Sequence, residues 1–179
     1  RSDPRMSELR HRAYDLELIF QQCFTRDFNT QLVGGVDEPL YQPADNKNTI
    51  NKIFYREDFF SSALHEVAHW CIASNKRRKL LDFGYWYDGS SRNNVQQARF
   101  QSVELVPQAI ELLFSQACHY SFEVSVDNFS VALGDIMIFD REVKEKAKQL
   151  SASGLPSRAV IFLQALTTFY AGSGTIVSA

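Results

Sequence analysis

The 179-residue chain is poor in cysteine, glycine and proline, with 3, 8 and 5 residues of these types. The cysteines, Cys23, Cys71 and Cys118, are far apart and form no CxxC pair, which argues against a disulfide framework and a cysteine zinc knuckle. We therefore expect small buried thiols in a reducing compartment. No run approaches the roughly 18 apolar residues of a membrane span, and the N-terminus is no signal peptide, so a cytoplasmic protein is expected.

The chain also lacks a strong charge of either sign. It has 19 Lys and Arg against 21 Asp and Glu, a net charge of −2, so no strong field attracts nucleic acid or an anionic membrane. With 45% hydrophobic residues, the composition excludes a disordered or low-complexity chain. Aromatic residues are abundant instead, with 14 Phe, 7 Tyr and 2 Trp.

Hydrophobic periodicity predicts helices and a few short strands in no strict alternation, which is typical of an α+β domain with a small sheet packed against several helices. The helices are expected over about 7–24, 58–75, 94–118, 140–151 and 157–170. The strands are expected over 30–33 (ended by Gly34 and Gly35), 50–55, 83–87 and 122–126. No repeat or linker divides residues 1–179, so one domain is predicted, with 1–6 an expression remnant or disordered and 172–179 a frayed tail.

The most specific motif is the HExxH sequence from His65 to His69. Residues four apart on a helix lie on the same face, so His65 and His69 can bind one metal ion, with Glu66 beside them. The opposite face of this helix is apolar and suits the core. Because only 4 histidines occur in the chain and two fall in this pattern, a metal site is a better interpretation than coincidence.

Two imidazoles do not complete a metal site, so a third ligand must come from elsewhere. The helix expected over 94–118 carries a polar stripe at steps of three and four, formed by Gln97, Gln101, Glu104, Gln108 and Glu111. Glu104, in the middle of the stripe, is the preferred third ligand. Glu111 and His119 are alternatives, and the stripe could also simply face solvent.

Two chemistries use such ligands. With zinc and Glu66 as the base, the site would suit a hydrolase, either a small peptidase or a nuclease. With Fe(II), two histidines and one carboxylate would suit an oxygenase. The spacing alone fits both, although Gln108 stands where the usual Glu-x-x-x-Asp continuation of one peptidase class would have an acid.

Longer stretches of residues 8–170 resemble the elongation factor P hydroxylase family. The matching segments are 62–73, 77–78 and 82–87, with 37–39 and 43–45 upstream and 103–104, 107–109 and 126–128 downstream. The turn after Tyr87, over 88–91, is shorter than the family's usual segment.

The resemblance implies a cytosolic bacterial enzyme that uses O₂ and non-haem Fe(II) to hydroxylate the lysyl-modified lysine at the loop tip of elongation factor P. It implies a zincin-like fold with His65, His69 and Glu104 as metal ligands. Glu66 then becomes an acid–base group or a group that orients and balances the ligands. No nucleic-acid or membrane partner is expected.

Several residues are candidate substrate contacts. The aromatic run 83–87 either fills the core as a strand or supplies Tyr85, Trp86 and Tyr87 as the wall that holds a lysine-like side chain. Arg77 and Arg78 belong to a solvated helix end or, under the resemblance, help to dock an acidic partner protein. Gln108 completes this set of candidates.

Overall fold

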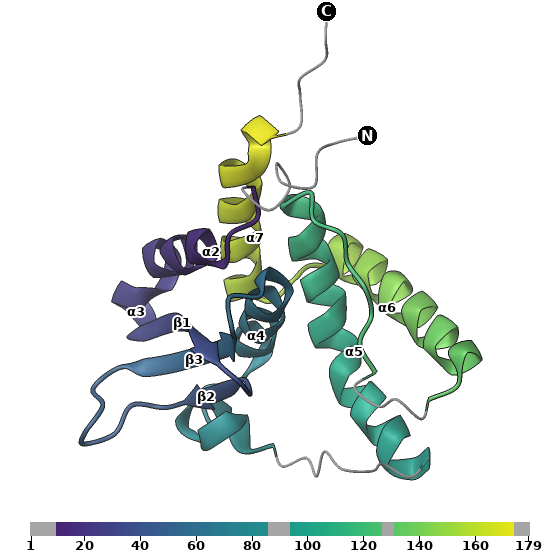
Figure 1. Ribbon diagram of the computed structural model, residues 1–179, viewed down its shortest axis with the longest axis horizontal. Helices are drawn as coiled ribbons and strands as arrows, with labels where there is room; N and C mark the ends of the chain where they lie inside the picture. Colours follow the sequence, from purple (N-terminus) through teal and green to yellow (C-terminus); the bar gives the residue numbers. More distant parts are fainter. Residues whose placement is uncertain (1–9, 86–93, 127–130, 174–179) are drawn as a thin grey trace, which may run out of the picture.

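The structure, a computed structural model, describes residues 10–85, 94–126 and 131–173 and has the predicted α+β class (Figure 1). Its helices are α2 (Ala13–Phe20), which continues through a π-helical turn into α3 (Arg26–Phe28), α4 (Phe60–Ile72), α5 (Asn94–Ala117), α6 (Leu133–Ser153) and α7 (Ser157–Tyr170). Its strands are β1 (Thr30–Val36), β2 (Leu40–Gln42) and β3 (Asn51–Arg56). That the whole chain forms one domain, and that the fold is zincin-like, stay predictions.

The sheet has the order β1-β3-β2, with β1 parallel and β2 antiparallel to β3. In the register, Ile53 of β3 pairs with Leu32 on one side and Tyr41 on the other, and all three side chains are buried. Helices α2 and α4 contact the sheet, and α7 packs on both helices. Rings of Phe20, Phe24, Trp70 and Phe162 meet in this core at centroid separations from 4.8 to 6.2 Å.

Helix α5 packs against α4, and α6 covers another side of α5, where Figure 1 shows it leaning away from the sheet. Phe139, Val143 and Ala147 of α6 form a second apolar cluster with Ala109 and Leu112 of α5. Within the described ranges, no helix has both the length and the apolar character needed to cross a bilayer.

The end predicted for the first strand is wrong, because β1 runs through Gly34 and Gly35 to Val36. Gly34 lies so close to β3 that an added Cβ would be 2.6 Å from the Tyr55 ring. The amide of Gly35 donates a 2.7 Å hydrogen bond to the Glu57 carbonyl. The two glycines therefore permit close pairing and do not end the strand.

The strand predicted over 83–87 is also wrong in its described part. Leu81–Gly84 forms a short 3₁₀ turn in which Asp82 and Phe83 have positive φ angles of 49° and 58°. Phe83 stacks on Tyr41 with a centroid separation of 4.3 Å, and this ring contact accounts for its burial without a strand. Trp86 and Tyr87 lie outside the described residues.

Residues 122–126 are not a strand either, since they pair with no other strand in the described parts of the chain. Side chains of α5 take the place of a partner strand. The amide of Gln108 bonds both the N–H and the carbonyl of Ser125, at 3.0 and 2.6 Å, and Gln97 donates to the Val126 carbonyl at 3.2 Å. Segment 122–126 thus has the alternating pattern of a strand, but its backbone forms hydrogen bonds with side chains of helix α5.

Candidate metal centre

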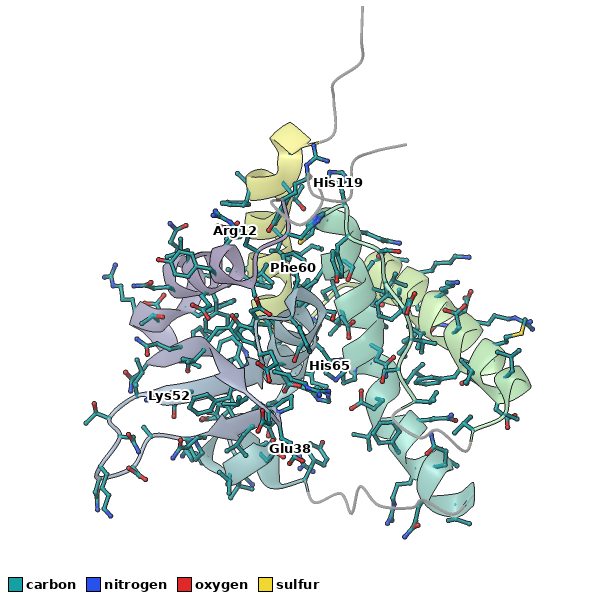
Figure 2. All side chains as sticks on the ribbon, viewed as in Figure 1. Arg12, Glu38, Lys52, Phe60, His65 and His119 are labelled. Carbon is teal, nitrogen blue, oxygen red and sulfur yellow. The ribbon has the colours of Figure 1, made fainter. Side chains whose placement is uncertain are left out.

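Helix α4 places both histidines of the HExxH motif on one face. Ala63, Leu64, Val67, Ala68 and Cys71 are buried on the core side of the helix. The side chains of His65 and His69 retain 23% and 16% exposure, and both contact Glu104 of α5; Figure 2 shows His65 on the side of α4 that faces α5. Amphipathic periodicity therefore fixes one face in the core and leaves the imidazoles at the α4–α5 boundary.

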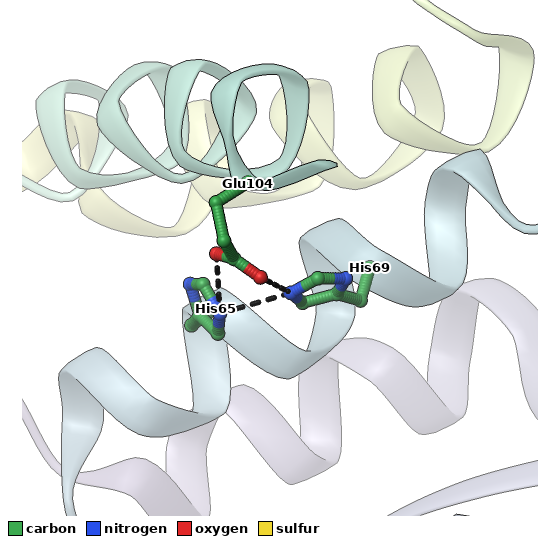
Figure 3. A group of neighbouring side chains, drawn as sticks. All are labelled: His65, His69 and Glu104. Atoms are coloured by element: carbon green, nitrogen blue, oxygen red, sulfur yellow. Dashed lines mark hydrogen bonds and ion pairs between the residues drawn. The ribbon is translucent and has the colours of Figure 1, made fainter. Parts of the chain in front are cut away.

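Glu104 of α5 reaches these imidazoles across the boundary (Figure 3). Its Oε1 lies 2.9 Å from Nε2 of His69, and its Oε2 lies 3.4 Å from Nε2 of His65. The two Nε2 atoms are 3.0 Å apart. Each residue offers one ligand atom, and these atoms lie within 4.8 Å of one another. We call these three side chains the His–His–Glu cluster.

These separations suit one metal ion. Two ligand atoms that each lie about 2.1 Å from an ion are about 3.0 Å apart at a right angle and about 3.4 Å apart at a tetrahedral angle. Two imidazoles and one carboxylate form a donor set that Zn²⁺ and non-haem Fe²⁺ both accept. The cluster thus has the spacing and the chemistry to hold a divalent metal, with coordination positions left over for other ligands.

Glu111 lies on the other side of the His65 ring. Its Oε1 is 2.6 Å from Nδ1 of His65, and its side chain is only 9% exposed. A carboxylate that accepts the Nδ1 proton leaves the Nε2 lone pair free to face the other ligands. His119, the other alternative ligand, is exposed beyond the end of α5 and far from His65 in Figure 2.

Gln108 donates a hydrogen bond to Glu104 from the same helix. It is 1% exposed, and its Nε2 donates to Oε2 of Glu104 at 3.3 Å as well as to the Ser125 carbonyl. Four of the five residues in the polar stripe on α5 thus have a structural role. Glu104 joins the cluster, Glu111 binds His65, and Gln97 and Gln108 secure the extended segment. The role of Gln108 as a substrate contact stays a prediction.

The electrostatics of the site follow from burial and proximity. Burial acts to raise the pKa of Glu104, but the charges of His69 and His65 and a hydrogen bond from His69 outweigh it and lower the pKa to about 2. Burial acts to lower the pKa of His65, but the hydrogen bond and charge of Glu111, with Glu104 and Glu66, raise it to about 10. Burial raises the pKa of Glu66. Glu66, Glu104 and Glu111 thus act together on the imidazole of His65, and such a group of carboxylates favours a bound cation.

Arg77 and Tyr85 lie beside the cluster. They line a small cavity of about 150 Å³ together with His69, Phe83 and Val103. The Arg77 guanidinium lies 4.1 Å from the centroid of the Tyr85 ring and donates to the Phe83 carbonyl at 2.9 Å. Both residues are therefore within reach of a molecule bound next to His69, and their contact with substrate stays a prediction.

Arg78 faces the C-terminal end of α4. Its Nη1 donates to the Ala73 carbonyl at 3.2 Å, and its guanidinium lies 5.6 Å from the Phe28 ring centroid. Its side chain takes part in the fold at the helix end.

Arg158 of α7 is a contributor that the sequence reasoning missed. Its guanidinium donates to the carbonyls of Trp70 and Ala73 at 2.6 and 2.5 Å and lies 4.6 Å from the centroid of the Trp70 ring. These carbonyls end the helix that carries His65 and His69, where a cation is favourable. No local signal could have revealed Arg158, because its partners are 85 to 88 residues away in the chain.

Comparison with known proteins agrees with the resemblance found in the sequence. A family model described as elongation factor P hydroxylase matches residues 19–178. The elongation factor P lysine hydroxylase of Haemophilus influenzae is 43% identical over 162 residues, which cover 90% of this chain and 91% of that protein. The chain therefore belongs to the elongation factor P hydroxylase family.

Proposed function

We propose that this protein hydroxylates the lysyl-modified lysine of elongation factor P, with O₂ as co-substrate and Fe(II) held by His65, His69 and Glu104. Membership of the family and the similarity to the Haemophilus influenzae lysine hydroxylase support this activity. The observation that carries the metal assignment is the His–His–Glu cluster, whose atoms lie within 4.8 Å of one another. Family membership also favours hydroxylation over the zinc-hydrolase alternative.

Fe(II) bound in such a donor set supplies oxygen activation, the chemistry that hydroxylation of an unactivated carbon requires. The chain's own residues prepare the site. Glu111 keeps the His65 ring in the orientation that presents Nε2, and Gln108 holds Glu104. Glu66, next to His65 and with a raised pKa, is proposed to hold or release a proton beside the ligands.

The substrate side chain must lie against the open side of the cluster with water kept away. We propose that Tyr85, together with Trp86 and Tyr87, contacts the aliphatic stem of the lysine. Arg77, stacked on Tyr85, is proposed to position that ring. We also propose that the chain acts in the cytoplasm as one domain, where its substrate translation factor is found.

The test is mass spectrometry of lysyl-modified elongation factor P after incubation with the Fe(II)-loaded protein and O₂. The expected result is a mass gain of one oxygen atom on the modified lysine. His65→Asn should abolish the gain, whereas His119→Asn, an identical change at an exposed histidine outside the cluster, should leave it intact. An unmodified substrate mass with the unaltered protein would refute the proposal.

A further inference from the structure

A cavity with a volume of about 840 Å³ lies outside the His–His–Glu cluster. It is bounded by the first turn of α4, by α5, by the extended segment 120–126 and by residues 131 and 136. Its polar lining includes Ser61, Glu111, Ser115, Glu123 and Ser125. We call it the serine-lined cavity. The described residues that line it include no lysine, arginine or histidine.

Ser115 offers a free hydroxyl group to this cavity. The residue is only 2% exposed, and its side chain lines the cavity. Its carbonyl accepts hydrogen bonds from Tyr120 and Cys118, but its hydroxyl forms none within the described part of the chain. The hydroxyl is therefore free to form a hydrogen bond with a polar group of a molecule in the cavity.

Glu111 connects the cavity to the metal centre. One of its oxygens, Oε1, binds Nδ1 of His65, while Oε2 has no hydrogen-bond partner among the described residues. Glu123 adds a second carboxylate to the lining. Two carboxylates, several hydroxyls and apolar walls that include Phe122 and Val124 suit an aliphatic chain that ends in an ammonium group.

We propose that the serine-lined cavity binds the lysyl group that extends the substrate lysine, with Ser115 and Glu123 accepting hydrogen bonds from its ammonium. The assignment of the extension to lysine rests on the proposed function. The cavity's charge and hydroxyl lining independently select a primary amine over a neutral or anionic group.

The dimensions of α5 agree with an extended side chain. Ser115 lies about 16 Å from Glu104 along the helix axis. The ammonium nitrogen of an unmodified lysine is at most about 5 Å from its own Cβ, which is too short to span from the level of Glu104 to Ser115. An added lysyl group contributes up to about 9 Å of bonded chain. The extended side chain therefore spans about 14 Å from the parent Cβ, and a hydrogen bond of about 3 Å covers the remaining axial separation to Ser115.

The test uses two small probes on the full-length, metal-loaded protein without O₂. One is lysine with a lysyl group on its ε-amine, and the other is lysine with an acetyl group there, both blocked at the parent backbone. NMR titration should give about tenfold tighter binding of the lysyl probe. Ser115→Ala and Glu123→Gln should each reduce that preference several-fold without changing the affinity for the acetyl probe.

Glu145→Gln, the same charge change at an exposed position of α6 outside the cavity lining, is the matched control and should keep the preference. Equal affinity for the two probes, or an unchanged preference in the folded Ser115→Ala and Glu123→Gln double variant, would overturn the inference. The proposed function is tested separately, by the mass gain of one oxygen atom on elongation factor P. Binding of the lysyl group in the cavity can therefore be refuted while hydroxylation is confirmed, and hydroxylation can be refuted while lysyl binding is confirmed.

Discussion

At the scale of single residues, the two nitrogens of His65 have different tasks. Nδ1 lies 2.6 Å from Glu111 and Nε2 lies 3.4 Å from Glu104, so the ring connects two carboxylates on the same helix. A metal ligand gains both orientation and basicity from such a partner. Glu111 is therefore a positioning residue for His65.

Replacing Glu111 should weaken metal binding. Glu111→Ala removes the acceptor of the Nδ1 proton, and the metal affinity should fall about 10- to 100-fold. Glu111→Gln keeps a hydrogen-bond acceptor without the charge and should give a smaller loss. Competition with a chromophoric chelator measures both. Glu142→Ala, at an exposed site on α6, is the control. Wild-type affinity in a folded Glu111→Ala protein would contradict this role.

Much of the site could be predicted at this scale because it depends on helix periodicity. His65 and His69 face the same way through their spacing of four, and Glu104 lies in a polar stripe of an otherwise apolar helix. Helix periodicity could not decide whether Glu104 or Glu111 lies nearer to both histidines, because both belong to the same stripe. It depends on which side of the His65 ring each carboxylate meets once α4 and α5 pack.

At the scale of elements, the C-terminal end of α4, the helix that carries His65 and His69, is bound by a cation from α7. Helix α4 ends at Ile72, and the N–H of Ala73 bonds the carbonyls of His69 and Trp70. Arg158 also donates to the Trp70 carbonyl, and both Arg158 and Arg78 donate to the Ala73 carbonyl. The helix that orients both imidazoles is thus secured by residues from other segments.

Arg158→Ala should destabilise the protein by about 2–3 kcal/mol. The change removes two hydrogen bonds from a charged donor, and the bond from Arg78 compensates for only one carbonyl. Denaturant unfolding followed by circular dichroism measures the free energy. Arg141→Ala, an exposed arginine on α6, should change it by less than about 0.5 kcal/mol. Equal stability of the two variants would rule out the capping role.

A second element-scale prediction concerns the contact between β1 and β3. Gly34→Ala would place a Cβ 2.6 Å from the Tyr55 ring and from the Glu57 carbonyl oxygen. The Tyr55 hydroxyl is held by Glu17 at 2.7 Å, so the ring cannot move away freely. A loss of about 1–3 kcal/mol in unfolding free energy is expected from thermal or denaturant unfolding.

Gly134→Ala is the matched control for Gly34→Ala. Gly134 lies in the first turn of α6, and an added Cβ meets nothing within 4 Å. Alanine favours the helix, so stability should rise by up to about 1 kcal/mol. A neutral Gly34→Ala would indicate that β1 and β3 can separate at this point.

At the scale of the whole molecule, the aromatic excess becomes the core that surrounds α4. Trp70, Phe20, Phe24 and Phe162 are fully buried together, and Cys71 lies buried on the same helix. The three cysteines are free, and Cys71 and Cys118 are buried as expected, whereas Cys23 is only half-buried.

The buried thiols should resist alkylation in the folded protein. Burial raises the pKa of Cys71 and of Cys118 to about 12, so their reactive thiolates become populated only as the pH approaches that value. Iodoacetamide at pH 8 should leave both unlabelled by mass spectrometry until denaturant is added, while the half-buried Cys23 reacts first. Labelling of Cys71 in the native state at the rate seen after unfolding would show that the core around α4 opens readily.

The sequence by itself determined the α+β class, the helices that carry the site and the pair of histidines, because these follow from local periodicity and from the chemistry of HExxH. Three features were decided by tertiary structure alone. They are the continuation of β1 through Gly34 and Gly35, the absence of a strand over 122–126, and the pairing of each carboxylate with one nitrogen of His65. Those outcomes depend on contacts between segments far apart in the chain, as when Gln108 takes the backbone groups of Ser125 or Arg158 caps α4. A local sequence pattern cannot indicate such partners, because the free energy of these contacts is gained only when the elements pack together.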